Sequence, residues 1–231
     1  MKRYNKQESV LEWGIKGQEY IKKARILVVG AGGLGCPALQ YLLGAGIGFI
    51  GIVDGDIVSE ENLHRQLVYT ETQIGLNKAI AAKHNLQLSN HEVQIKGFDF
   101  YLSKENAQEI ILDYDLVLDC TDDLAIRHVI HQACHTLQKP LILAANYLWE
   151  GYVIHFSMQK DTARLQDIFP EQINDVPTCN NLGAIGPVLG VLGSLQAIEA
   201  LKIITKHPSM MCNQLFHINL KTMQTSLIQI K

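Results

Sequence analysis

One stretch of the chain, VDGDIVSEENLHRQ, places two carboxylates shortly before a group of amide and cationic side chains. These polar residues are Asp54, Asp56, Asn62, Arg65 and Gln66. An acid at the end of a strand can accept hydrogen bonds from a ribose, and arginine binds phosphate well. If ENLHRQ forms a helical turn, its two amides and its arginine share one face, because they lie three and four residues apart. The stretch predicts a nucleotide site; the alternative is a solvated helix with ordinary surface charges.

A glycine-rich loop, GAGGLG, precedes this stretch and contains Gly30, Gly32, Gly33 and Gly35. Its G-x-G-x-x-G spacing lies between a predicted strand and a predicted helix, and Asp54 ends the next predicted strand. In that context glycines let the backbone approach a phosphate, and the helix N-terminus favours the phosphate's charge. The loop predicts an adenine-nucleotide site without separating NAD from ATP. The alternative is a tight turn that only packs helix against strand.

The cations near this loop favour ATP. A dehydrogenase has little use for Arg65 unless it binds a 2′-phosphate, whereas ATP needs cations beside its β- and γ-phosphates. Lys78, at the start of a predicted helix, could supply a second phosphate contact, although a single lysine is more often a solvated surface charge. The chain contains no G-x-x-x-x-G-K-[ST] loop, so the P-loop NTPases are set aside.

Asp122 is the expected magnesium ligand. It follows the predicted strand DLVLDCT, which in doubly wound order lies beside the first strand. There Asp122 would face the phosphates from the opposite wall, and a carboxylate so close to polyphosphate needs an intervening cation. Helix N-capping by Thr121, Asp122 or Asp123 is the alternative.

The elements that must position these residues alternate between strand and helix. Apolar, β-branched runs predict strands at 24–30, 47–54, 91–100, 115–121 and 140–146. Helices are expected between them at 36–46, 74–89, 103–112 and 123–137. Single-helix connections imply right-handed crossovers and a parallel sheet covered on both faces. This pattern predicts an α/β fold with a Rossmann-like, doubly wound sheet.

The pattern changes after residue 147. GYVIHFSM is expected to form a strand antiparallel to its neighbour, because no helix of crossover length precedes it. Residues 159–183 have weak periodicity and predict a long, functional crossover loop with one helical turn. Residues 186–206 predict one long apolar helix, and NQLFHINL and MQTSLIQI predict a hairpin. The C-terminal half should therefore add antiparallel strands to a parallel N-terminal half.

The composition is that of one globular domain. The chain has 231 residues, 47% hydrophobic and 19% charged, which suits a single core. We expect one domain over 1–231, with a nucleotide-binding half at 24–146, the crossover loop at 159–183, and a C-terminal helix and hairpin at 184–231. A net charge of −3 with scattered cations predicts no nucleic-acid partner. The apolar runs are too short and glycine-rich for membrane spans, and no secretory segment is recognisable, so a cytoplasmic protein is expected.

The cysteines predict neither a disulfide framework nor a zinc site. There are five, at 36, 120, 134, 179 and 212, and none forms a CxxC pair. Cys36, Cys120 and Cys134 lie on core-facing elements and are expected to be inert. No histidine has metal-ligand spacing, so none is given a catalytic role.

Several motifs occur in an order that resembles a known family. They are RYNKQ at 3–7, GAGGLG at 30–35, the DGD…NLHRQ run, GLNK at 75–78, DLVLDCTD at 115–122, TC at 178–179 and GSLQAIEALK at 193–202. Over nearly the whole chain they resemble the MoeB/ThiF/HesA adenylyltransferases, relatives of the ubiquitin-activating enzymes. The resemblance implies a homodimer that uses ATP and Mg²⁺ to adenylate the C-terminal glycine of a ubiquitin-like sulfur carrier ending in Gly-Gly. It also implies a cysteine desulfurase or a rhodanese as sulfur donor.

The resemblance assigns roles by position. Asp54 matches a ribose-binding acid, and Asp122 matches a Mg²⁺-associated aspartate. The phosphate contacts are matched by Asn62, Arg65 and Lys78. Lys6 stands where close relatives have an arginine thought to reach the ATP of the partner subunit, so the charge is kept but the bidentate fork is lost.

Two features limit the match. Cys179 matches a loop cysteine that forms a thioester or persulfide in some members; the alternative is a small loop residue with no covalent role. Close relatives also carry two zinc-binding CxxC pairs, whereas here the first position reads DTAR and the chain ends in LIQIK. No structural zinc is therefore expected.

Three classes of function follow. The first is activation of a ubiquitin-like carrier for sulfur transfer in thiamine, molybdopterin or related biosynthesis. The second keeps ATP but activates another carboxylate, either tRNA-linked or peptide. The third is a non-catalytic or NAD-binding Rossmann protein, against which Asn62, Arg65 and Asp122 together argue. Within the first class the motifs do not select one carrier, because specificity lies in the carrier-facing surface.

Overall fold

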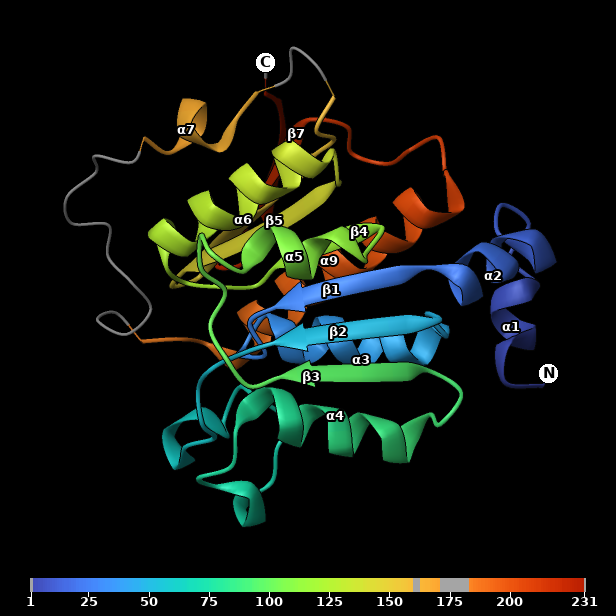
Figure 1. Cartoon of the computed structure of the whole chain (residues 1–231). Coiled ribbons are helices and arrows are strands. Elements are labelled where there is room, and N and C mark those ends of the chain that lie inside the picture. The colour runs from blue at the N-terminus through green and yellow to red at the C-terminus, as the bar shows by residue number, and fades with distance from the viewer. Residues whose placement is uncertain (1, 160–162, 171–182, 231) are drawn as a thin grey trace.

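The strands of the protein form one mixed sheet. The computed structural model describes residues 2–159, 163–170 and 183–230 (Figure 1). Within them, eight strands lie in the order β3-β2-β1-β4-β5-β6-β7-β8. Their bounds are β1 (Arg25–Val29), β2 (Phe49–Val53), β3 (Gln94–Phe98), β4 (Leu116–Asp119), β5 (Leu141–Tyr147), β6 (Glu150–Phe156), β7 (Gln214–Asn219) and β8 (Gln224–Gln229). Neighbours from β3 to β5 pair in parallel, and β5 to β8 pair antiparallel, which confirms the predicted fold class.

Helices cover both faces of the sheet (Figure 1). Their bounds are α1 (Asn5–Glu8), α2 (Gly14–Lys23), α3 (Gly35–Ala45), α4 (Lys78–Ser89), α5 (Ala107–Leu112), α6 (Leu124–Leu137), α7 (Leu165–Ile168) and α9 (Gly186–Thr205), with short 3₁₀ turns η1 (Lys2–Tyr4), η2 (Glu60–Asn62) and η3 (Glu71–Gln73). The core on one face includes side chains of α3, α4 and α9. The core on the other face includes side chains of α5, α6 and α7. Two apolar layers therefore enclose the central strands, as a doubly wound sheet requires.

The register brings the predicted site residues together at the carboxyl ends of the central strands. Val29 at the end of β1 pairs with Val53 of β2 on one side and with Asp119 of β4 on the other. The glycine loop, Asp54 and the loop after β4 consequently start at the same level. The strand order reverses at β1, and ligands of open α/β sheets bind at such a switch point.

Some element boundaries differ from the sequence-based prediction. The helix expected at 74–89 begins at Lys78, because the Asn77 side chain accepts a hydrogen bond from the Ile80 amide at 3.1 Å and caps it there. Residues 74–76, predicted as helix, form a turn and a bend between η3 and α4 instead. Helices α1 and α2 were not predicted, because their sequence is polar and α2 buries only Gly17, Gln18 and Ile21.

The long C-terminal helix packs in the core. Among the described residues, α9 is the helix long and apolar enough to cross a membrane by length and composition alone. Its inner face, however, belongs to the core cluster that it shares with α3, with Val188, Leu189, Leu192, Ala197 and Ala200 all buried. Core packing therefore accounts for its apolar length. The turn predicted inside the crossover loop is present as α7; residues 160–162 and 171–182, including Cys179, lie outside the described part of the chain.

Candidate functional site

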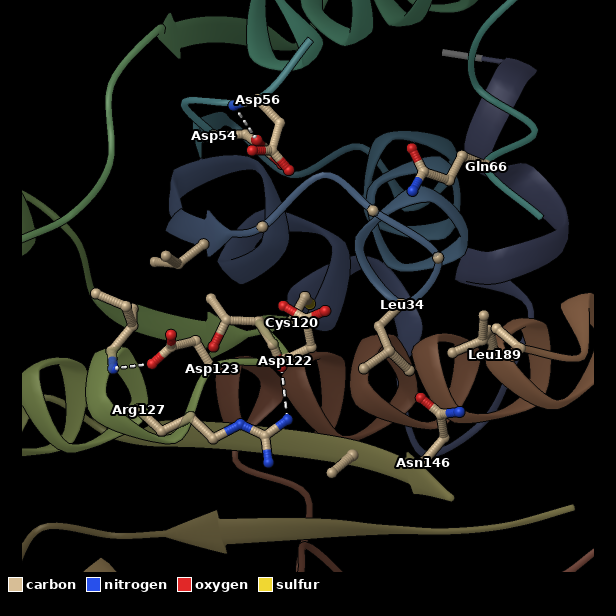
Figure 2. A pocket seen from close by; sticks show the side chains of 18 of the residues that line it. Leu34, Asp54, Asp56, Gln66, Cys120, Asp122, Asp123, Arg127, Asn146 and Leu189 are labelled. Atoms are coloured by element: carbon tan, nitrogen blue, oxygen red, sulfur yellow. Dashed lines mark hydrogen bonds between the residues drawn. The ribbon is translucent and has the colours of Figure 1, made fainter. Parts of the chain in front are cut away.

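A cavity of about 870 Å³ opens at the carboxyl edge of the central strands (Figure 2). The predicted residues that line it are Gly30, Gly32, Gly33, Asp54, Asp56, Asn62, Arg65, Gln66, Lys78 and Asp122. Gly35 lies beneath the loop rather than in the lining, and Lys6 is on α1, away from the cavity (Figure 1). The topology thus brings most of the predicted nucleotide site into one space.

The loop glycines have different neighbours. Gly30 has φ +90°, a backbone conformation that favours glycine, and a Cβ at Gly35 would lie 2.0 Å from the Gly30 carbonyl oxygen. A Cβ at Gly33 would lie 2.5 Å from Cδ1 of Leu189 in α9. A Cβ at Gly32 would meet only the Gln66 side chain, at 3.5 Å. The fold therefore requires Gly30 and Gly35, whose neighbours are backbone atoms, whereas a Cβ at Gly33 would displace only the end of the Leu189 side chain. The space at Gly32 is available to a ligand.

Asp54 connects the end of β2 to the glycine loop. Its Oδ2 accepts a hydrogen bond from the Ala31 amide at 2.7 Å, and its Oδ1 accepts one from the Asp56 amide at 2.9 Å. Burial raises the pKa of Asp54, while the Ala31 amide and Lys78 act in the opposite direction. Both carboxylate oxygens keep acceptor capacity, so a fixed acid stands where a ribose acceptor was predicted.

Asp56, Lys78 and Tyr101 form a small network at the cavity wall. Nζ of Lys78 lies 3.0 Å from Oδ2 of Asp56, and the Tyr101 hydroxyl donates to Oδ1 of the same carboxylate. Burial acts to raise the pKa of Asp56, but the hydrogen bonds from Tyr101 and Lys78 outweigh it and the pKa is lowered. The Lys78 side chain is only 8% exposed, so its ammonium is held in place before any phosphate arrives.

The ENLHRQ stretch forms the predicted helical turn. The amides of Arg65 and Gln66 donate to the Asn62 carbonyl at 3.1 and 3.0 Å. Asn62 and Gln66 are buried, and all three side chains line the cavity. The Arg65 guanidinium donates to the Glu61 carbonyl at 2.8 Å. Oε1 of Gln66 is buried without a hydrogen-bond partner among the described residues, as a group that awaits a ligand donor would be.

In the loop after β4, the two predicted roles, helix capping and magnesium binding, fall to different aspartates. Asp123 caps α6, since its Oδ1 accepts a hydrogen bond from the Ile126 amide at 3.0 Å (Figure 2). Asp122 is exposed and lines the cavity. The capping alternative therefore belongs to Asp123, and Asp122 faces the glycine loop across the cavity.

The carboxylate of Asp122 suits a Mg²⁺ ion whose other ligands include phosphate oxygens. Among residues 2–159, 163–170 and 183–230, no three His, Cys, Asp or Glu side chains gather as a metal site. Mg²⁺ is commonly bound by one or two carboxylates together with substrate phosphates, so one carboxylate beside a phosphate site is compatible with it. Asp122 is the residue in the cavity that would hold this ion.

Sequence reasoning missed a second half of the cavity. It is lined by Arg127, Asn146, Tyr147, Glu150, Tyr152, Phe169 and His217, mostly from the β5–β6 hairpin and its neighbours. The rings of Tyr152 and Phe169 stack with centroids 5.4 Å apart. Asn146, Tyr147, Glu150 and Tyr152 lie within seven consecutive residues, and the other three come from distant segments. The one usable signal was the polar and aromatic run NYLWEGY at the end of a predicted buried strand.

Comparisons with known proteins agree with this arrangement. The model of the ThiF family matches residues 4–231. The chain belongs to the ThiF family. It is 40% identical over 206 residues to "Adenylyltransferase and sulfurtransferase MOCS3" of Caenorhabditis briggsae, covering 88% of this chain and 51% of that protein. It is 43% identical over 206 residues to "Adenylyltransferase and sulfurtransferase UBA4" of Meyerozyma guilliermondii, covering 88% and 49%. The chain thus spans about half the length of these ThiF relatives.

Solved structures share the ThiF-type fold at low identity. E. coli MccB with MccA-N7isoASN has a TM-score of 0.86 at 18% identity and covers 99% of this chain and 71% of that one. E. coli MccB with ATP has a TM-score of 0.84 at 20% identity, covering 100% and 72%. PaaA has a TM-score of 0.84 at 22% identity, covering 99% and 73%. At these identities the likeness concerns the fold, and it agrees with the predicted Rossmann-like ThiF architecture.

Proposed function

We propose that this chain is an ATP-dependent adenylyltransferase. Its substrate is the C-terminal glycine carboxylate of a small ubiquitin-like carrier, which it converts to an acyl-adenylate with release of pyrophosphate. The observation that supports this best is one cavity in which Asp122 faces the glycine loop and the cations Arg65 and Lys78, with room beside them for a second substrate. Two relatives at 40% and 43% identity are named adenylyltransferases, which favours the same reaction here.

The proposed chemistry needs positioning and charge stabilisation. A carboxylate is already a nucleophile toward the α-phosphorus, so no general base is required. Asp54 orients the ribose, Gly32 lets the backbone approach the phosphates, and Asn62 fixes the phosphates from the facing turn. Arg65 and Lys78 stabilise the charge that develops on the leaving pyrophosphate. Mg²⁺, when bound at Asp122, supplies neutralisation of the phosphate charge.

The second half of the cavity would hold the carrier tail. Its walls include the stacked rings of Tyr152 and Phe169, and Tyr147 lies at the rim with 53% of its surface exposed. A tail of two glycines has no side chains and can lie close against this aromatic surface, where a bulkier residue would be held away from it. This shape favours a Gly-Gly terminus over a branched C-terminal residue.

We further propose that the acyl-adenylate serves sulfur transfer in thiamine, molybdopterin or related biosynthesis, with a cysteine desulfurase or rhodanese as sulfur donor. Cys179 would be the covalent site of such a transfer. A homodimer is part of the proposal. Lys6 is exposed on α1, at the end of the sheet opposite the cavity, so it could serve an ATP site only in a partner subunit (Figure 1).

ATP–pyrophosphate exchange tests the activation step. We expect exchange by the purified protein to depend on a Gly-Gly-terminated carrier, and to be lost with a carrier lacking these two residues. Asp122→Ala should abolish exchange because the phosphate charge would no longer be balanced. Tight Mg·ATP binding without exchange on any carrier would contradict the carrier assignment and favour another carboxylate, such as a peptide or a tRNA-linked acid. Stabilisation against heat by NAD rather than by Mg·ATP would contradict the ATP assignment.

A further inference from the structure

Arg127 joins the two halves of the cavity. It lies in the first turns of α6, and its Nη2 donates to the Thr121 carbonyl at 2.5 Å and to the Ala144 carbonyl at 3.3 Å (Figure 2). Thr121 belongs to the loop that carries Asp122, and Ala144 belongs to β5, which supports the proposed tail-binding half. One guanidinium therefore contacts both walls.

Thr121 is held from a second direction by Asp119. Oδ1 of Asp119 accepts hydrogen bonds from the Thr121 amide at 2.9 Å and from the Thr121 hydroxyl at 2.7 Å. Asp119 is completely buried at the end of β4. Together with the Arg127 contact, the amide, the hydroxyl and the carbonyl of Thr121 are all fixed. The residue directly before Asp122 thus has little conformational freedom, although Asp122 itself is exposed.

The base of this arrangement is fixed by α9. Nε2 of Gln196, which is fully buried, donates to the Asp119 carbonyl at 2.9 Å and to the Ile142 carbonyl at 3.2 Å. The Cys120 thiol donates to Oε1 of the same glutamine at 3.3 Å. These bonds hold β4 and β5 together below the loop. The loop after β4 is therefore fixed by Gln196 through the β4 backbone on one side and by Arg127 on the other.

We infer that Arg127 and Asp119 are positioning residues for the activation step, which clamp Thr121 and thereby fix Asp122 at a set distance from the tail-binding wall. We call these three residues, Asp119, Thr121 and Arg127, the clamp. The inference rests on the proposed function. Proximity effects in catalysis are steep, since a misplacement of about 1 Å can cost on the order of 100-fold in rate. Loss of the clamp should therefore slow the reaction much more than it weakens ATP binding.

Arg127→Lys is the most informative variant. It keeps the positive charge beside buried Asp119, so it avoids an uncompensated buried charge. The lysine ammonium, however, ends one bond short of the Nη2 position from which Arg127 donates to Thr121 and Ala144. We expect kcat for exchange to fall on the order of 100-fold. The KM for ATP, and ATP affinity measured by calorimetry without Mg²⁺, should stay at the wild-type values. Hydrogen–deuterium exchange should show lost protection of the peptide that contains residues 120–123.

Matched variants separate positioning from folding. Arg25→Lys is the control, because Nε of Arg25 also donates to a main-chain carbonyl, that of Asp113 at 2.6 Å, far from the cavity; it should retain full exchange. Thr121→Val removes the hydroxyl donor to Asp119 and should lower kcat in the same way. Thr121→Ser keeps that donor and should have the wild-type kcat.

The outcomes distinguish the clamp from the proposed function. Three results for Arg127→Lys would each overturn the clamp. They are a wild-type kcat, unchanged amide protection at residues 120–123, and a raised KM for ATP with no change in kcat. An inactive wild-type protein would instead contradict the proposed activation reaction. In that case the deuterium measurement, which needs no catalysis, still decides whether Arg127 holds the loop.

Discussion

At the scale of single residues, the glycines of the loop have different roles: some are needed for folding, and Gly32 leaves space for a ligand. The Cβ position at Gly35 is occupied by the Gly30 carbonyl, which belongs to the backbone and cannot move cheaply. The Cβ position at Gly32 has only the end of the Gln66 side chain nearby. Two glycines of the same motif should therefore respond differently to the same added methyl group.

We predict that Gly32→Ala folds normally but binds ATP at least about tenfold more weakly, which corresponds to about 1.4 kcal/mol. Gly35→Ala should yield little folded protein, because a 2.0 Å approach to backbone cannot be relieved. Gly44→Ala is the control: it is exposed in α3 with open space at its Cβ, and it should gain about 0.5–1 kcal/mol of helix stability. Circular dichroism, thermal unfolding and ATP calorimetry measure these effects. Normal ATP affinity in Gly32→Ala would show that no phosphate approaches the loop there.

At the scale of elements, α6 and α7 are joined by a buried histidine. The Leu165 amide at the start of α7 donates to Nε2 of His131 at 3.2 Å, and the His131 ring packs edge-on against Phe156. Burial, followed by the charges of His135 and His128, lowers the pKa of His131 from 6.5 to about 4. The folded protein therefore prefers the neutral ring, whose nitrogen can accept the Leu165 amide.

This pKa predicts how stability depends on pH. Between pH 6.5 and about 4 the unfolded chain binds a proton at this position and the folded chain does not, so the free energy of unfolding falls as the pH falls through this window. The full loss is on the order of 3 kcal/mol. His131→Gln keeps an acceptor without titrating and should flatten the dependence, whereas His91→Gln, at an exposed position, should not. Urea unfolding across this pH range measures it, and an equal slope in both variants would contradict the assignment.

The elements also show what local sequence can predict. The alternation of strands and helices, the switch to antiparallel strands and the meeting of Asp54 with Asp122 all followed from apolar periodicity and the rules for doubly wound sheets. The start of α4 was missed by a few residues because the capping side chain of Asn77 is oriented by tertiary hydrogen bonds to the Asp54 and Asp56 carbonyls, which local sequence does not reveal. Helix α2 was missed because its stability comes from tertiary contacts of a few residues rather than from a broad apolar face.

The candidate site was predicted only in its nucleotide half. Residues of that half belong to contiguous motifs whose chemistry can be recognised locally, such as GAGGLG. The residues of the other half, including Arg127 and Tyr152, come from separate elements and acquire their roles only through the β4–β5–β6 packing. In the sequence, Arg127 in particular cannot be told from an ordinary surface charge on an amphipathic helix.

At the scale of the whole molecule, the proposed dimer makes each ATP site depend on two chains. If Lys6 acts on the partner's ATP, Lys6→Ala and Asp122→Ala should each impair exchange alone. Mixed and allowed to re-form, the two variants should recover roughly a quarter of wild-type activity, because about half of the dimers are mixed and each contains one intact site. No recovery, despite mixed dimers detected by native mass spectrometry, would show that Lys6 has no role in the partner's site.

The most direct measurement is the intact mass of the carrier after incubation with this protein, ATP and Mg²⁺, with pyrophosphatase present to remove the leaving group. We expect the mass of the carrier to increase by one adenylyl group, which is AMP minus water. The added mass should be lost on treatment with a nucleophile such as hydroxylamine and should not appear with Asp122→Ala. ATP consumption with no adduct, or an adduct on a carrier that lacks its C-terminal Gly-Gly, would contradict the claim that this cavity adenylates a glycine carboxylate.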